Sequence, residues 1–185
     1  MNKFELVKNE IWSIIPKSPI ESDLMHSKLI LKWLLKLDPN ASEELQIAAV
    51  GHDMERAITG ITEKDLKNYS KINEFKKEHA IRSANYVEEI LNKYKYTQKE
   101  IKKIKYLIEN HECGGDKEAD ILKSADSLAY FEYNIPVYLK MNGEQRAIEK
   151  CKFMYERLSE DAKKLVKKIK YKDKTISNIV KMAIE

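Results

Sequence analysis

All four histidines of the chain fall into one ordered series with two aspartates. The series runs His26, the adjacent pair His52 and Asp53, His79, His111 and Asp126. Imidazole and carboxylate groups are the usual nitrogen and oxygen ligands of metal ions in proteins. The residue types therefore predict a site for one or two divalent metal ions, with Mn, Ni, Co, Zn, Mg and Fe as candidates.

Apolar residues at helical spacing accompany each member of the series. His26 shares a stripe with Ile30 and Leu34, and His111 follows Ile104. Residues three and four apart line one face of a helix, and the apolar face turns inward. A single histidine on such a stripe is more often a hydrogen-bonded core residue than a ligand. Five segments that each aim a titratable group at the core favour a shared ion, because buried polar groups are costly unless they are paired.

Capping residues and chain breakers separate these segments. The stretch Ser18 to Glu21 predicts a helix start before His26, Thr97 to Glu100 predicts a capping box, and Asp116 predicts the cap of the helix that carries Asp126. The weakly periodic stretch 59–73 predicts a loop or short helix near the site. Asn142 and Gly143 precede a predicted final pair of helices.

The length and composition indicate one all-α domain. The 185 residues suit a single domain, 1–185, with the motifs in a core of about residues 20–135 and with C-terminal helices at 143–185 packed on it. The chain has only five glycines and four prolines, which disfavours an all-β fold with many turns. The two cysteines are too few for a disulfide framework, and Cys113, two residues after His111, is interpreted as a bystander.

Charge and hydropathy bear on location and partners. No apolar run reaches the length of a membrane span, and residues 1–17 do not resemble a signal peptide, so a cytoplasmic location without membrane contact is expected. The net charge is +4, and most lysines alternate with glutamates as on solvated helix faces. The basic stretch Lys163 to Lys174 is interpreted as a solvated helix end, and no aromatic pattern for nucleic-acid binding accompanies it.

The order His, His-Asp, His, His, Asp on consecutive helices resembles the HD-domain superfamily of metal-dependent phosphohydrolases. The matching segments are His26-Ser27-Lys28, residues 51–56, Glu78-His79-Ala80, Asn110-His111-Glu112 and Ser124-Ala125-Asp126. The His-Asp doublet alone is a weak signal, whereas the doublet with all its partners in order is specific. The resemblance implies a compact multi-helix HD-domain fold with the metal site between the core helices.

The resemblance also implies a ligand set. It assigns His26, His52, Asp53 and Asp126 to a first ion. Neighbouring residues of a helix point about 100° apart, so an adjacent His and Asp can both reach an ion beside that helix. The nucleophile would be a water molecule bound to the ion, which lowers the pKa of that water.

A second ion is one of two possibilities that the sequence leaves open. Asp53 could bridge to an ion held by His79 and His111, and two ions roughly 3.5–4 Å apart stabilise both the attacking and the leaving oxygen. With one ion, His79 and His111 would instead contact the substrate or protonate the leaving group. In both cases Asp53, His79 and His111 are the predicted catalytic residues.

Three cations near the ligands are predicted to bind substrate. Arg56 follows His52 by four residues, Arg82 follows His79 by three, and Lys123 precedes Asp126 by three, so each shares the helix face of its ligand. An arginine suits a phosphate because its planar fork donates two hydrogen bonds. A surface salt bridge is the competing interpretation for each. Glu55 is predicted to orient a ligand or a water molecule.

Two departures from related patterns narrow the substrate. HD proteins that cleave cyclic dinucleotides show a paired His-His-Glu and a Gly-Tyr-Pro signature, whereas this chain has Asn110-His111-Glu112 and no such signature. Hydrolases of alarmone nucleotides place an acidic pair after the doublet, whereas Glu55-Arg56 stands there in this chain. Neither substrate class is favoured.

The leading hypothesis is a phosphohydrolase that cleaves a phosphoester or phosphoanhydride in a small, nucleotide-like substrate. One alternative is a non-catalytic sensor or interaction module that the metal holds together. The other is an HD-type oxygenase in which the same six ligands hold two irons. The sequence indicates neither the substrate, nor the native metal, nor the oligomeric state.

Overall fold

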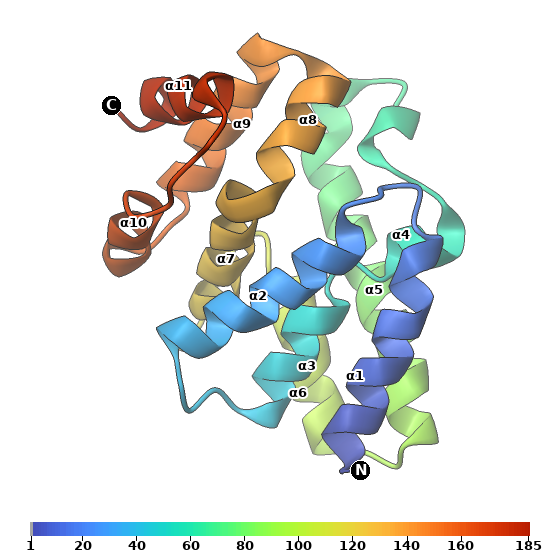
Figure 1. Ribbon diagram of the computed structural model, residues 1–185. Coiled ribbons are helices and arrows are strands. Elements are labelled where there is room, and N and C mark those ends of the chain that lie inside the picture. The colour runs from blue at the N-terminus through green and yellow to red at the C-terminus, as the bar shows by residue number, and fades with distance from the viewer. Residues whose placement is uncertain (1) are drawn as a thin grey trace.

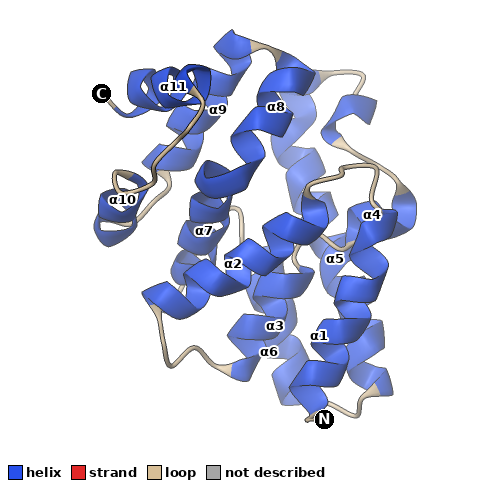
Figure 2. Cartoon of the chain, in the orientation of Figure 1, coloured by secondary structure: helices blue, strands red, loops and turns tan. Residues whose placement is uncertain are grey.

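Helices form every regular element in residues 2–185 of the computed structural model, the part of the chain that the structure describes, and no strand occurs there (Figure 2). The predicted all-α class is therefore confirmed. The α-helices are α1 (Lys3–Ile14), α2 (Asp23–Leu37), α3 (Glu43–Gly51), α4 (Glu55–Thr59), α5 (Ile72–Lys93), α6 (Gln98–Glu109), α7 (Lys117–Ala129), α8 (Ile135–Asn142), α9 (Glu144–Glu156), α10 (Glu160–Val166) and α11 (Lys174–Ile184).

Shorter helical turns connect several of these helices. They are the 3-10 turns η1 (Ile15–Lys17), η2 (Glu63–Asp65) and η3 (Tyr69–Lys71), and the π-helical turn η4 (Tyr130–Asn134). The stretch 59–73 therefore holds short helical turns, as its weak periodicity predicts. The turn η4 joins α7 to α8 without a break in the chain's helical path.

The helices gather at two ends of the molecule. Helices α1, α3, α5 and α6 surround the end that holds the N-terminus, and α9, α10 and α11 lie at the opposite end (Figure 1). Helix α2 packs along α7 and against α3, α5 pairs with α6, and α9 packs on α8 and α11. The long α2–α7 contact lies between the two ends, where the histidine-bearing segments meet.

A continuous apolar core supports this arrangement. Fully buried side chains come from α2, α3, α6 and α7, including Ile30, Leu34, Leu45, Ile104 and Leu122. Burying a leucine or isoleucine side chain contributes about 1.5–3 kcal/mol. Several of these residues neighbour a member of the histidine series on the same helix, so the apolar stripes bring the polar groups inward as the sequence predicts.

Two of the predicted helix starts are correct and one is wrong. Thr97 and Glu100 form a capping box at α6, and Asp116 accepts a hydrogen bond from the Ala119 N–H at the start of α7. Helix α2, however, begins at Asp23 and not near Ser18. Ser18 has extended backbone before Pro19, as residues before proline prefer. Its hydroxyl donates to Asp23 Oδ2 at 2.6 Å.

The C-terminal part contains three helices, and the predicted final pair is wrong in number. Asp173 accepts hydrogen bonds from the N–H groups of Thr175 and Ile176 and so starts α11 as a separate helix. Cys151, Met154 and Leu158 are buried, and Leu165 is partly buried. The basic stretch Lys163 to Lys174 spans the end of α10 and the linker that follows it.

Gly51 lets α3 approach α5 closely. A Cβ atom at this position would lie 2.7 Å from Cγ2 of Val87 on α5, so a side chain would push the two helices apart. Gly51 is the last residue of α3 and directly precedes His52. The close contact therefore fixes His52 relative to α5, which carries His79.

Within residues 2–185, the helices are all too short or too polar to cross a membrane.

Candidate metal centre

The six members of the histidine and aspartate series converge from five parts of the chain. His26, His79 and Asp126 lie on α2, α5 and α7. His52 caps the C-terminus of α3, with Asp53 next to it, and His111 follows the end of α6 by two residues. The prediction that every member lies within a helix is thus wrong for His52, Asp53 and His111. Helical periodicity does not reveal at which residue a helix stops.

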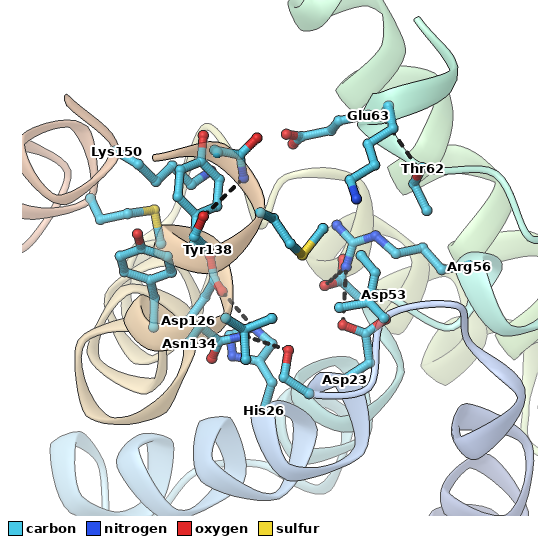
Figure 3. Close-up of a pocket in the computed structure, with 18 of the residues that line it drawn as sticks. Asp23, His26, Asp53, Arg56, Thr62, Glu63, Asp126, Asn134, Tyr138 and Lys150 are labelled. Atoms are coloured by element: carbon cyan, nitrogen blue, oxygen red, sulfur yellow. Dashed lines mark hydrogen bonds and ion pairs between the residues drawn. The ribbon is translucent and has the colours of Figure 1, made fainter. Parts of the chain in front are cut away.

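His26, His52 and Asp126 form the first group that could hold a metal ion. One ligand atom from each lies within 4.8 Å of the others, and all three residues are buried. Nε2 of His26 is 3.0 Å from Oδ1 of Asp126 (Figure 3). Helices α2 and α7 supply this pair, and their long contact explains why residues 100 positions apart meet.

His52, Asp53 and His111 form a second group with the same spread of ligand atoms. His52 belongs to both groups, and its ring centroid is 4.8 Å from that of His111. The two groups together contain five of the six predicted ligands. An ion beside His52 could therefore be reached from either side.

His79 contacts the cluster through Asp53. Its Nε2 is 2.8 Å from Oδ1 of Asp53, and its Nδ1 is 2.6 Å from Oε2 of Glu55, which is fully buried. His79 belongs to neither of the two ligand groups. That His79 and His111 together bind a second ion therefore stays a prediction. Glu55 lies where its carboxylate can orient the His79 ring.

Hydrogen bonds to backbone carbonyls hold the ring orientation of two histidines. Nδ1 of His52 donates to the Ala49 carbonyl at 3.1 Å, and Nδ1 of His111 donates to the Ile108 carbonyl at 2.7 Å. A carbonyl only accepts, so each of these Nδ1 atoms carries a proton. A neutral ring then keeps its lone pair on Nε2, which faces the cluster. Metal-binding histidines are oriented in this way by the partner of their other nitrogen.

The charges of the cluster fit a bound cation. Burial opposes ionisation of Asp126, but hydrogen bonding from His26 and the positive charge of Arg157 hold its pKa well below the usual range. Burial also opposes protonation of His52, yet the charge of Asp53 raises its pKa to about 9. The carboxylates thus favour a positive charge at this place, and a divalent ion there would compete with the proton for Nε2 of His52. Nδ1 of His26 is buried without a hydrogen-bond partner among residues 2–185, and the nitrogen and oxygen donors suit a divalent ion.

Arg56 lies at the cluster, held by carboxylates. Its Nη1 forms an ion pair with Oδ2 of Asp53 and lies 3.8 Å from Oδ1 of Asp23 (Figure 3). Burial opposes the charge of Arg56, but Asp53 and Asp23 outweigh burial and raise its pKa. Arg56 also lines a cavity that adjoins the cluster and is described below. A phosphate group in that cavity would have to compete with Asp53 and Asp23 for the guanidinium of Arg56.

Arg82 and Lys123 lie outside the cavity that residues 2–185 form. Nε of Arg82 donates to Glu55 at 2.7 Å, and Nζ of Lys123 donates to Asp120 at 2.9 Å. Sequence spacing places each on the helix of a ligand but does not show which neighbouring carboxylate it reaches first. The contact of Arg82 and Lys123 with substrate stays a prediction. Their positions outside the cavity do not favour it.

A cavity of 430 Å³ extends from the cluster toward the C-terminal helices. Its volume lies in the range of about 300–1,000 Å³ that is typical of small-molecule sites. One wall comes from α4 and the segment after it, with Arg56 and Thr62, and the other comes from η4, α8 and α9, with Asn134, Tyr138 and Lys150 (Figure 3). The cluster therefore adjoins a space that can hold a ligand.

The π-helical turn η4 keeps one face of the α7–α8 segment on this cavity. Asp126, Tyr130, Asn134 and Tyr138 all line it at steps of four residues. In an ideal α-helix each such step overshoots a full turn by about 40°, so the series would rotate away. The wider i→i+5 turn at 130–134 offsets this drift.

Several cavity residues are absent from the predicted site. They are Asp23, Glu112, Asn134, Tyr138, Arg146, Lys150 and Arg157. Arg157 donates to the His111 carbonyl at 2.9 Å and to Glu112 at 3.0 Å, and it lies 3.3 Å from Oδ2 of Asp126. The spacing of Arg146, Lys150 and Arg157 on one helix face is visible in the sequence. That this face borders the cluster is not.

The fold and the cluster define an all-α protein with a buried histidine and aspartate site that could hold a metal ion. A family model described as a domain of unknown function, DUF4202, matches residues 10–180, and the chain belongs to this family. No HD-domain family matches. Among curated proteins and among solved structures, nothing matches the chain at a significant level.

Proposed function

We propose that this protein is a metal-dependent phosphohydrolase of the HD type that acts on a small phosphorylated substrate, with a nucleotide as the best-fitting class. The single observation that carries the proposal is the position of the cluster at the end of the cavity. His26, His52 and Asp126 form one ligand group, and His52, Asp53 and His111 form a second that shares His52. A cavity of small-molecule size starts at these groups.

A bound divalent ion would supply an activated water nucleophile and a charge that stabilises the leaving oxygen. The chain's own residues do the positioning. Asp53, which pairs with Arg56, would be one of the residues that hold the ion, and Arg157 holds Asp126 and the His111 backbone in place. The Glu55 carboxylate accepts a hydrogen bond from Nδ1 of His79, and Nε2 of His79 is directed at Asp53.

Cationic side chains suit a phosphorylated substrate. Arg56, Arg146, Lys150 and Arg157 all line the cavity. Glu112 and the aspartates of the cluster offset part of this charge at the end where the ion would bind, and Glu63 offsets part of it farther from the cluster. The cations farther from the cluster remain available to the anionic part of a ligand.

The cavity also bears on the alternatives. A metal that serves only to hold the fold together would need no space beside it, whereas this cluster adjoins 430 Å³. An oxygenase would need two irons. The ultraviolet-visible spectrum of aerobically purified protein separates that case, because oxo-bridged iron absorbs where Mn, Zn and Mg do not.

The test combines metal analysis with a substrate panel. The purified protein is stripped with a chelator, reloaded with Mn, Ni, Co, Mg or Zn, and assayed for release of phosphate or pyrophosphate from nucleotides and other phosphoesters. We expect bound metal, turnover of at least one nucleotide and a lower Tm after stripping, since a ligand that binds only the folded state stabilises it. A fully loaded protein that releases nothing from the whole panel would contradict the proposed activity.

A further inference from the structure

The part of the cavity farthest from the cluster has a distinct character. We call it the distal half, and it is lined by Thr62, Glu63, Tyr69, Tyr138, Arg146 and Lys150. Glu63, Thr62 and Lys150 lie on the side of the cavity away from His26 and Asp126 (Figure 3). The guanidinium of Arg146 stacks over the Tyr69 ring at 5.5 Å.

Lys150 faces this space without an anionic partner. Within residues 2–185 it forms no hydrogen bond or ion pair, and its Nζ lies only over the ring of Phe153, at 5.4 Å. Burial lowers the pKa of Lys150 and the neighbouring charge of Lys76 lowers it further, and the charges of Glu63 and Glu112 offset only part of this lowering. Lys76, by contrast, is paired with Glu112 at 3.3 Å. A partly buried cation without a counter-ion is costly, and an anionic ligand would remove that cost.

The register of α9 places these cations at defined distances from the cluster. Arg146, Lys150 and Arg157 are separated by four and seven residues and all line the cavity. At 1.5 Å per residue, Lys150 is about 10 Å and Arg146 about 16 Å along the helix axis from Arg157. Arg157 touches Asp126, so the helix carries positive charge from the cluster to the distal half.

We infer that Lys150 and Arg146 form a second anion subsite, which binds a phosphate group of the substrate other than the one that reacts at the cluster. This inference rests on the proposed function and narrows its substrate class. The fitting ligands are small molecules with two phosphate groups at different positions, such as nucleoside bisphosphates. The rings of Tyr69 and Tyr138 border the same space and offer faces on which a base can stack.

A binding experiment tests the subsite without requiring activity. Inorganic pyrophosphate is titrated by calorimetry into chelator-treated wild-type protein, Lys150→Met and Lys152→Met. Lys152 is an exposed residue of the same helix, so its variant is matched in charge and helix position. We expect Lys150→Met to weaken binding about 10- to 100-fold, as the loss of a charge-assisted hydrogen bond does, and Lys152→Met to bind as the wild type.

Two outcomes would overturn the subsite: no pyrophosphate binding by the wild type, or equal affinity in the wild type and Lys150→Met. Circular dichroism checks that each variant is folded. Arg146→Met gives an independent measurement, because Arg146 is exposed and its side chain contributes no ion pair among the described residues. It is expected to weaken binding in the same direction, and unchanged affinity in both variants would refute the inference.

A kinetic experiment separates this inference from the proposed function. With the metal-loaded enzyme, kcat/KM is compared for a nucleoside monophosphate and the corresponding bisphosphate. The wild type and Lys152→Met should prefer the bisphosphate, and Lys150→Met should lose about 10-fold or more of that preference. A preference that survives in Lys150→Met contradicts the subsite. No turnover of either substrate contradicts the phosphohydrolase, while the pyrophosphate titration still decides the subsite.

Discussion

The two ends of the cavity differ in how their polar side chains are satisfied. At the cluster, His52 and His111 donate to backbone carbonyls, His79 is held between two carboxylates, and Arg157 binds three acceptors. In the distal half, Lys150 lies over the ring of Phe153 and Arg146 over that of Tyr69, and neither forms an ion pair within residues 2–185, although Glu63 lines the same space. The same cavity thus joins a fixed polar network to a set of unpaired cations.

The two ends of the cavity therefore suit different ligands. Buried polar groups that are oriented by fixed partners hold their geometry before an ion arrives, as a metal centre requires. Cations without partners keep their hydrogen-bonding capacity for a ligand that enters from solvent. The cluster end therefore suits a bound metal ion, and the distal half suits the anionic ligand that we propose.

The largest loss of activity is expected from Asp53→Ala, which removes a carboxylate from the cluster. Asp53 contacts His79 and Arg56 and belongs to a ligand group with His52 and His111. Its loss removes a ligand and leaves Arg56 without its closest counter-ion, so kcat/KM should fall to background. Metal content by mass spectrometry is measured alongside. Near-normal turnover with metal retained would refute the role of Asp53.

Arg56→Ala tests the boundary between the two ends, because Arg56 both pairs with Asp53 and lines the cavity. If Arg56 exchanges Asp53 for a substrate phosphate, kcat/KM should fall about 10- to 150-fold while metal content is unchanged. Arg56→Lys should recover only part, because a point charge cannot replace the bidentate fork. Unchanged kcat/KM in Arg56→Ala would exclude Arg56 as a phosphate-binding residue. A variant that fails to fold would show instead that Arg56 stabilises the structure through its ion pairs.

Glu55→Gln tests whether the hydrogen bond from His79 to Glu55 affects metal affinity and activity. The buried Glu55 carboxylate accepts from Nδ1 of His79 and pairs with Arg82. Outer partners of this kind typically contribute about 10- to 100-fold in metal affinity or activity. Glu78→Gln is the matched control, since the exposed Glu78 also pairs with Arg82. Equal activity of the two variants would show that Glu55 does not act through His79.

The smallest effect is expected from Lys123→Ala. Lys123 donates to the exposed Asp120 and lies outside the cavity formed by residues 2–185. Exposed ion pairs contribute about 0–1 kcal/mol, so Tm should change little and kcat/KM should remain at the wild-type value. A rise in KM comparable to that of Lys150→Met would place Lys123 at the substrate after all.

Several features of the fold could be predicted from local sequence because their causes are local. The capping box of Thr97 and Glu100 involves neighbouring residues only. Helix ends were harder to predict. The sequence pattern continues through His52 and His111, but α3 ends at Gly51 and α6 at Glu109. Backbone hydrogen bonding and tertiary contacts such as that of Gly51 with Val87 decide where a helix stops, and periodicity does not contain them.

The sequence alone indicates a helical chain and six core-facing side chains of metal-ligand type, because residue types and apolar spacing are local properties. Only the tertiary structure decided that His111 joins His52 and Asp53, that Arg56 is held by Asp53, and that α9 borders the cavity. These facts depend on distances between segments far apart in the chain. Packing of α2 on α7 and of α8 on α9 sets those distances, and no local pattern encodes them.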